Sequence, residues 1–169
     1  MKFQTDRLTL RPLSTNDLLT THKYATDLDV TKYMIYLPNH NVDETLGFLK
    51  WCEKEWGKEQ PEDYEFAICL YGKHIGAISL SRIDEFSCEL GWVLDKEYHG
   101  RGFATEAAQE LVRFAKSLGA KEVIAHCDTR NMASRRVMEK LGMKFVLEQD
   151  RQYSDERGKA REYEYAMTL

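Results

Sequence analysis

Alternating polar and apolar positions mark the strands that this chain is expected to form. Residues 7–11 alternate near the start of the chain, and residues 66–70 alternate near its centre. An alternation of period two predicts strands that bury one face. Residues 71–73 then form the turn of a hairpin whose returning strand covers residues 74–83. Further strands are predicted at residues 89–94, 123–127, 144–148 and 163–167.

Helical periodicity fills the segments between these strands, at residues 14–25, 30–34, 41–58, 104–118 and 133–141. Ser14, with Asp17 three residues later, predicts a helix start. Asn41 or Asp43 begins the longest early helix. Gly119 ends the predicted helix at residues 104–118. The order of elements predicts an α+β fold with a mixed sheet, because hairpin strands precede the later helices instead of a regular βαβ winding.

Length and composition favour one compact globular domain over residues 1–169. The net charge of −4 argues against a nucleic-acid partner, and no apolar run is long enough for a membrane span. The first residues contain no apolar segment of the kind found in secretory signals. Four cysteines stand far apart, at 52, 69, 88 and 127, and predict buried thiols instead of disulfides or metal ligands. Reduced thiols point to a cytoplasmic location.

The most informative segment, residues 89–107, is a strand followed by a glycine-bearing turn and a helix start. The first amides of a helix have no partner inside the helix and lie at the positive end of its dipole, which suits a pyrophosphate. A tight strand-to-helix connection that happens to use glycine is the alternative. A Rossmann turn fits less well, because Gly100-x-Gly102 lacks the third small residue and hairpin strands precede it. Glu122 does follow Gly102 by 20 residues, but it lies at the start of the next strand.

Four segments together resemble the Gcn5-related N-acetyltransferase superfamily. His99-Gly100-Arg101-Gly102-Phe103-Ala104 is similar to its motif A, Gln/Arg-x-x-Gly-x-Gly/Ala, with His99 in place of the usual Gln or Arg. Residues 72–76 resemble the central hairpin, and residues 131–143 resemble motif B. Residues 5–12 resemble the start of the branch that includes the ribosomal-protein N-terminal acetyltransferases. The resemblance covers nearly the whole chain and implies a single-domain fold whose mixed central sheet has splayed central strands flanked by helices.

The resemblance implies direct transfer of acetyl from acetyl-CoA to a primary amine, with no metal. The cofactor would lie between two splayed strands, and Gly91 is expected to carry the bulge that starts the splay. His99 is expected to be a turn residue near the phosphates, and this interpretation is preferred to a role as the catalytic base. The expected cofactor-binding residues are Trp92, Val93, Leu94, His99, Gly100, Arg101, Gly102, Phe103, Ala104, Thr105 and Asn131.

Two residues are candidates for the proton transfers of such a reaction. Glu89 is a carboxylate in an otherwise apolar strand, and partial burial would raise its pKa and make it a better base. A structural carboxylate, at the solvent end of the strand or paired with an arginine, is the alternative. Ser134 matches the position from which the family protonates the CoA thiolate. Ser134 and Asn131 both fit equally well as helix-capping residues.

The sequence says less about the site of the acceptor amine, and the acceptor could be a protein N-terminus or a small-molecule amine. Tyr33 and Tyr36 are the expected substrate-binding residues, with Trp51 and Tyr153 as further candidates for the wall, although single aromatics also fit a core. The charged residues 150–161 predict a solvated hairpin loop. A non-catalytic acyl-CoA-binding sensor or assembly domain is the alternative function, and a structural domain without a cofactor is a third. The sequence is compatible with a homodimer and does not decide the oligomeric state.

Overall fold

The computed structural model describes residues 1–169, and its first half builds one side of a single mixed sheet. The strands of this half are β1 (Phe3–Gln4), β2 (Leu8–Pro12), β3 (Asp63–Leu70), β4 (Lys73–Arg82) and β5 (Ser87–Leu94). The helices between them are η1 (Thr15–Asp17), α1 (Leu18–Ala25), α2 (Leu28–Thr31) and α3 (Val42–Trp56).

The second half continues the same sheet with η2 (Lys96–Tyr98), α4 (Phe103–Ser117), β6 (Glu122–Asp128), α5 (Met132–Leu141), β7 (Lys144–Gln152) and β8 (Lys159–Thr168). The strand order is β1-β2-β3-β4-β5-β6-β8-β7, and every neighbouring pair is antiparallel except β5 with β6. The predicted α+β fold with a mixed sheet is therefore confirmed.

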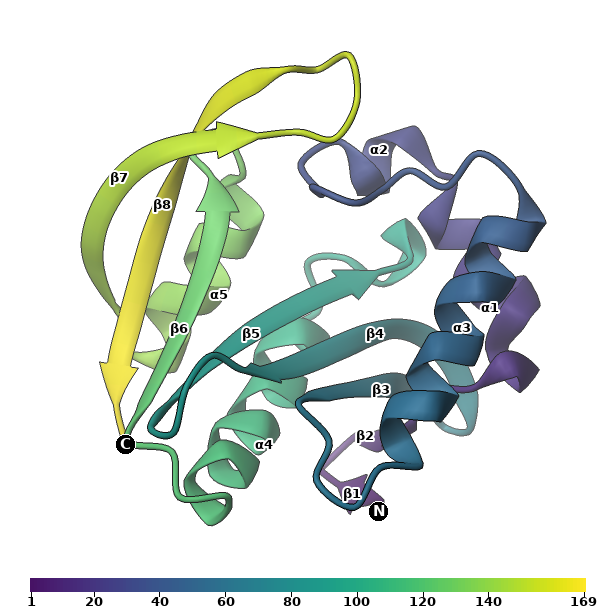
Figure 1. Ribbon diagram of the computed structural model, residues 1–169, viewed down its shortest axis with the longest axis horizontal. Helices are drawn as coiled ribbons and strands as arrows, with labels where there is room; N and C mark the ends of the chain where they lie inside the picture. Colours follow the sequence, from purple (N-terminus) through teal and green to yellow (C-terminus); the bar gives the residue numbers. More distant parts are fainter.

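Helices cover both faces of the sheet, and each face has its own core (Figure 1). On one face, Phe103, Leu111 and Phe114 of α4 pack against alternate residues of β3 and β4, such as Phe66 and Ile78. On the other face, Leu49 and Cys52 of α3 and Tyr24 of α1 pack against Ala67 and Ala77. The period-two alternation in β3 and β4 therefore supplies two cores from the same strands.

Four elements differ most from the sequence prediction. The short helix lies at Leu28–Thr31 instead of 30–34, because the Asp27 carboxylate accepts hydrogen bonds from the amides of Asp29 and Val30 and starts the helix earlier. Strands β7 and β8 are longer than predicted, and the short strand β1 was not predicted. In β1, only two residues pair with β2, which is too short a run for an alternation to be read.

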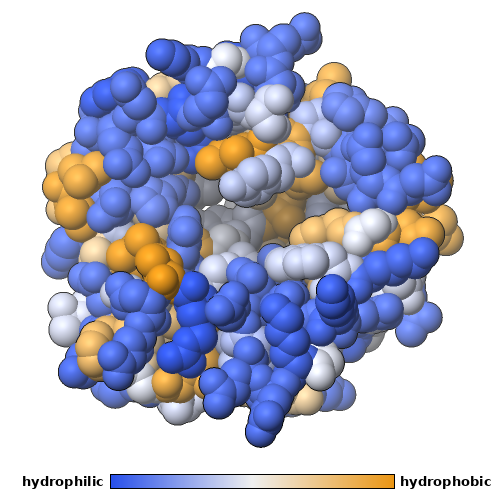
Figure 2. All heavy atoms as spheres, in the orientation of Figure 1, coloured by the Kyte–Doolittle hydropathy of each residue, from blue (hydrophilic) through white to orange (hydrophobic).

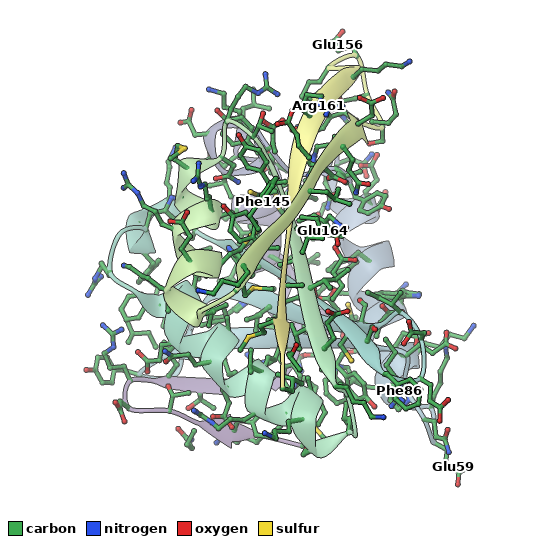
Figure 3. All side chains as sticks on the ribbon, turned by 90° about the vertical axis from the view of Figure 1, so that its left-hand side faces the viewer. Glu59, Phe86, Phe145, Glu156, Arg161 and Glu164 are labelled. Atoms are coloured by element: carbon green, nitrogen blue, oxygen red, sulfur yellow. The ribbon has the colours of Figure 1, made fainter.

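Half of the charged segment 150–161 is strand, because β7 runs to Gln152 and β8 starts at Lys159, so the predicted hairpin loop is limited to residues 153–158. Arg161 lies opposite Asp150 and forms ion pairs with both Asp150 and Glu148. Arg151 is buried and lies 2.6 Å from the buried Glu162 carboxylate. Charge pairs across the two strands therefore stabilise a ladder that the charged composition alone does not predict. Figure 3 shows this hairpin, with Glu156 at its tip and Arg161 just below the tip.

All four cysteines are free and buried, as predicted. Burial raises the pKa of the Cys127 thiol to about 11, so this sulfur remains a thiol near neutral pH. None of the helices combines the length and the apolar character that crossing a membrane requires.

Candidate active site

The two central strands β5 and β6 run parallel and then separate. They pair only from Ser87–Glu122 to Glu89–Ile124, and the edge of β5 that faces β6 is unpaired from Leu90 onward. Figure 1 shows the two strands diverging upward from their common start. The predicted splay is present, but the predicted bulge at Gly91 is not. The register of β5 with β4 is continuous through Gly91, and a Cβ there would lie 2.8 Å from Ser79 Oγ, so close packing explains this glycine.

A cavity of about 540 Å³ occupies the opening between the diverging strands. Its walls come from α1, α3, the segment after α2, strands β3 to β6, the start of α5, and Arg151 of β7. Figure 2 shows the hollow in the middle of the face, with apolar and pale intermediate side chains around its mouth. An opening of this size, with mainly apolar walls and a few polar groups, is typical of a ligand site.

The glycine turn lies directly after the open edge of β5. Gly100 and Gly102 have positive φ angles of 72° and 81°, and Gly102 is the N-cap residue of α4. The backbone amides of residues 100–105 donate no hydrogen bond within the chain. Six consecutive free amides at a helix N-terminus are the arrangement that the predicted pyrophosphate site requires.

Arg7 holds this turn in place, and the sequence analysis did not single it out. Its Nε atom lies 2.6 Å from the carboxylate of Glu106 in the first turn of α4, and its Nη1 donates to the carbonyl of Arg101. The guanidinium groups of Arg7 and Arg101 both lie against the Phe103 ring, which is buried. The resemblance of residues 5–12 to the start of the family was the available signal for this contact.

The side chain of His99 links the turn to the end of β5. Its Nε2 atom lies 2.8 Å from the carbonyl oxygen of Leu94 and donates to it. The imidazole is therefore used inside the turn, and the Leu94 carbonyl has a partner already. The open strand edge that remains runs from Leu90 to Val93.

Asn131 and Ser134, at the start of α5, line the cavity. The side chain of Asn131 caps this helix: its Oδ1 accepts from the Ser134 amide at 3.2 Å, and its Nδ2 donates to Ser134 Oγ at 3.1 Å. Asn131 is thus the N-cap residue, and Ser134 is a first-turn residue. Because its oxygen accepts from Asn131, the hydroxyl hydrogen of Ser134 remains able to donate into the cavity.

Glu89 lies at the point where the strands part, and its partner is a histidine. Its Oε1 atom lies 2.8 Å from Nδ1 of His126 on β6, and Nε2 of His126 lies 3.2 Å from Glu164 on β8. The hydrogen bond that His126 donates to Glu89, together with the charge of Glu89 and a second hydrogen bond to Glu164, raises the pKa of His126 to about 9 in spite of its partial burial. Near neutral pH this imidazole is a cation between two carboxylates. Figure 3 shows Glu164 on β8, below Arg161.

A sequence profile described as the acetyltransferase (GNAT) domain matches residues 7–144. The chain belongs to the GNAT acetyltransferase family. The uncharacterised N-acetyltransferase YnaD of Bacillus subtilis (strain 168) is 29% identical over 147 residues, which are 85% of this chain and 83% of YnaD.

Solved structures show the same family fold. A GNAT-family acetyltransferase from Bacillus anthracis superposes with a TM-score of 0.86 at 28% identity, covering 99% of this chain and 98% of that chain. The ribosomal L7/L12 α-N-protein acetyltransferase RimL, solved in complex with coenzyme A, shares the fold with a TM-score of 0.85 at 14% identity, covering 100% and 98%. The resemblance predicted from residues 5–12, 72–76, 99–104 and 131–143 is confirmed.

The aromatic residues predicted for the acceptor side of this GNAT domain divide into two groups. Tyr33, Tyr36 and Trp51 line the cavity. Tyr153 does not, which corrects that prediction: it is buried, and its hydroxyl donates to Asp128 Oδ2 at 2.6 Å. A tyrosine whose ring is in the core and whose hydroxyl has a buried carboxylate partner is structural.

The turn between β7 and β8 forms hydrogen bonds with the segment that contains Tyr33 and Tyr36. Arg157 donates to the carbonyls of Thr31, Lys32 and Leu37, and Ser154 donates to the carbonyl of Ile35. These contacts join residues more than 115 positions apart in the chain, so no local pattern predicts them. They fix one wall of the cavity on the C-terminal hairpin. No cluster of three or more His, Cys, Asp or Glu side chains is arranged to hold a metal ion.

Proposed function

We propose that residues 1–169 form one N-acetyltransferase domain that transfers acetyl directly from acetyl-CoA to a primary amine. The observation that carries the proposal is the succession of an open β5 edge, a turn with six free amides, and a cavity between β5 and β6. The presence of coenzyme A in the structure of RimL supports the choice of cofactor.

The cofactor's pyrophosphate would accept hydrogen bonds from the amides of residues 100–105, with Arg101 at the rim of the turn. Its amide-rich pantetheine arm would pair with the free edge at Trp92 and Val93, as an added strand does. This arrangement directs the thioester toward the point where β5 and β6 part, between Glu89 and Ser134. The four free, buried thiols support a cytoplasmic setting.

The reaction needs two proton transfers. The amine nitrogen attacks the thioester carbonyl carbon, and the carbon–sulfur bond breaks as the carbon–nitrogen bond forms. Glu89 would take the proton that the nitrogen loses, directly or through water, while His126 holds the carboxylate in position. Ser134 would donate its hydroxyl proton toward the departing sulfur, because Asn131 occupies its oxygen as a donor.

A turnover assay with acetyl-CoA and a panel of amines and peptides tests this function, with release of the CoA thiol as the readout. The protein's own four thiols are buried and contribute little background. The Ser134→Ala variant is the informative comparison, since the Asn131 cap on the Ser134 amide survives this change. We expect its kcat to fall by about a hundredfold or more with little change in acetyl-CoA affinity.

Two outcomes would contradict parts of this proposal. Binding of CoA without turnover of any amine would indicate a sensor or assembly domain. Full activity of Ser134→Ala would leave Ser134 as a helix residue only.

A further inference from the structure

The floor of the cavity contains two carboxylates that the proposed reaction does not use. Asp63 and Glu65 lie on β3, where Asp63 is paired in register with Ser81 and Glu65 with Ser79. Ser81 and Ser79 are in turn paired with Glu89 and Gly91 of β5. Residues directly opposite each other on antiparallel strands share a face, so these residues all lie on the face that lines the cavity.

Charge pairing leaves these two carboxylates without a partner. Glu89 is paired with His126, and Arg151, the guanidinium on the cavity wall, is paired with Glu162. No hydrogen bond or cation of the chain reaches the Glu65 carboxylate, and burial together with the charge of Asp63 raises its pKa to about 7. The remaining exposed surface of Glu65 faces the cavity. An unpaired acidic group in such a position is costly for the fold and calls for a cationic ligand.

An aromatic pair lies on the cavity wall beside this floor. Phe48 and Trp51 of α3 stack with ring centroids 5.9 Å apart, and both keep more than a third of their surface exposed. Aromatic faces attract organic ammonium groups and also cover methylene chains. Carboxylates and aromatic rings on the walls of one cavity match an aliphatic ammonium ligand better than a metal ion, which would need several oxygen ligands in close geometry.

The position of Glu65 excludes it as the base for the reacting nitrogen. It lies two strands away from β5, which corresponds to about 10 Å across the sheet. The thioester is expected at the other end of the cavity, beside Glu89 and Ser134. A single molecule that reaches both places needs two nitrogen atoms separated by a short carbon chain.

From this juxtaposition we propose that the acceptor is a dicationic aliphatic amine, whose second ammonium binds Asp63 and Glu65 while its first nitrogen is acetylated. This assignment rests on the proposed acetyltransferase function and names its substrate class. The apolar wall made by Phe48 and Trp51 would cover the methylene groups between the two nitrogens.

The test compares kcat/KM for putrescine, a four-carbon diamine, with that for n-butylamine, which has the same chain and one nitrogen. We expect the wild-type protein to prefer putrescine by about tenfold or more, which corresponds to about 1.4 kcal/mol. Glu65→Gln should bring the ratio of the two values close to one. Glu62→Gln is the matched control, because Glu62 is the exposed neighbour of β3 that does not line the cavity, and its ratio should equal that of the wild type.

A second measurement separates lost binding from lost folding. Because Glu65 is an unpaired, partly buried carboxylate whose pKa is raised to about 7, its charged form at pH 8 destabilises the fold, and Glu65→Gln should raise the midpoint temperature of unfolding at that pH relative to the wild type. A lower midpoint would contradict an unpaired carboxylate and overturn the assignment.

Three activity results would also overturn the assignment while leaving the acetyltransferase function intact. These are equal kcat/KM for the two amines in the wild type, a putrescine preference that persists in Glu65→Gln, and turnover of peptides alone. Absence of turnover with every amine would instead overturn the proposed function itself.

Discussion

At the residue scale, Glu89 and Glu65 show how neighbouring carboxylates on one sheet face acquire different properties. Glu89 lies within 2.8 Å of His126, whereas Glu65 has no hydrogen-bonding partner and a pKa raised to about 7 by burial and by Asp63. The first is held beside the point where the strands part, and the second lines the cavity without a partner. Partners from other strands therefore decide the chemistry of residues that look alike in the sequence.

Replacement of Glu89 by glutamine tests its role as the proton acceptor. Glu89→Gln keeps the size of the side chain and removes its basicity, so the variant should be slow near neutral pH, where the acceptor amine is protonated. A rising pH supplies free amine from solution, and the activity gap to the wild type should narrow toward pH 9 and above. For an α-amine acceptor the narrowing should come about two pH units lower than for an aliphatic amine, whose pKa resembles that of lysine.

The measurement is the ratio of the two kcat/KM values from pH 6.5 to 9.5, with acetyl-CoA affinity as the internal control. A ratio that stays constant over this range would show that Glu89 orients or packs without accepting a proton. Loss of folding in the variant would identify a structural carboxylate.

At the element scale, the turn between β5 and α4 combines three local features. Gly100 and Gly102 adopt positive φ angles, the amides of residues 100–105 are free, and Arg7 ties the turn to α4 through Glu106. The first two features follow from residues within one short segment. The third comes from the other end of the chain and fixes where the turn lies against β2.

Gly102→Val tests the turn as the pyrophosphate site. A β-branched side chain at φ +81° strains the backbone and places atoms where the phosphates would approach. CoA affinity should fall tenfold or more, which is about 1.4 kcal/mol. Gly119→Val is the matched control, since Gly119 has a φ of +88° at the opposite end of α4 and imposes the same kind of strain away from the site.

Titration calorimetry with CoA on the folded proteins provides the comparison. Equal affinities for Gly102→Val and Gly119→Val would exclude the turn as the phosphate site. A loss confined to Gly102→Val would support it.

At the scale of the whole molecule, the two halves of the sheet meet along a short seam. Strands β5 and β6 share only three register pairs, Ser87–Glu122, Cys88–Val123 and Glu89–Ile124. His126 lies just beyond this seam and joins β5 to β8 through Glu89 and Glu164. The splay that opens the cavity thus removes ladder hydrogen bonds, and an ion-paired histidine links the strands at that place.

Stability should therefore depend on pH through His126. The pKa of this histidine is raised from 6.5 to about 9, so its contribution to the free energy of unfolding is complete below about pH 6.5 and is lost as the pH rises through about 9. The contribution is about 1–2 kcal/mol, because the partner Glu89 is partly exposed. His126→Gln should be less stable than the wild type at pH 6 and should approach it by pH 9.5.

Urea unfolding at several pH values between 6 and 9.5 measures this difference. Parallel curves for the wild type and the variant would show that the imidazole is not a cation in the folded protein.

The sequence by itself determined the elements whose signals are local. Alternation predicted strands β2 to β4, glycine marked the turn at residues 100–102, and Asn41 and Asn131 marked helix starts. These signals act through φ angles, caps and side-chain periods within a few residues, so they survive without knowledge of the fold. The family motifs added the mixed sheet with splayed central strands and the expected role of the turn at residues 99–104.

Only the tertiary structure decided which side chains face each other. His126 is 37 positions from Glu89, and Arg157 is 120 positions from the Leu37 carbonyl to which it donates. The continuous register at Gly91 and the unpaired state of Glu65 likewise depend on strand order and on what lies on neighbouring strands. Such contacts depend on register across a whole sheet, and a change of one residue in register would send every side chain of a strand to the other face.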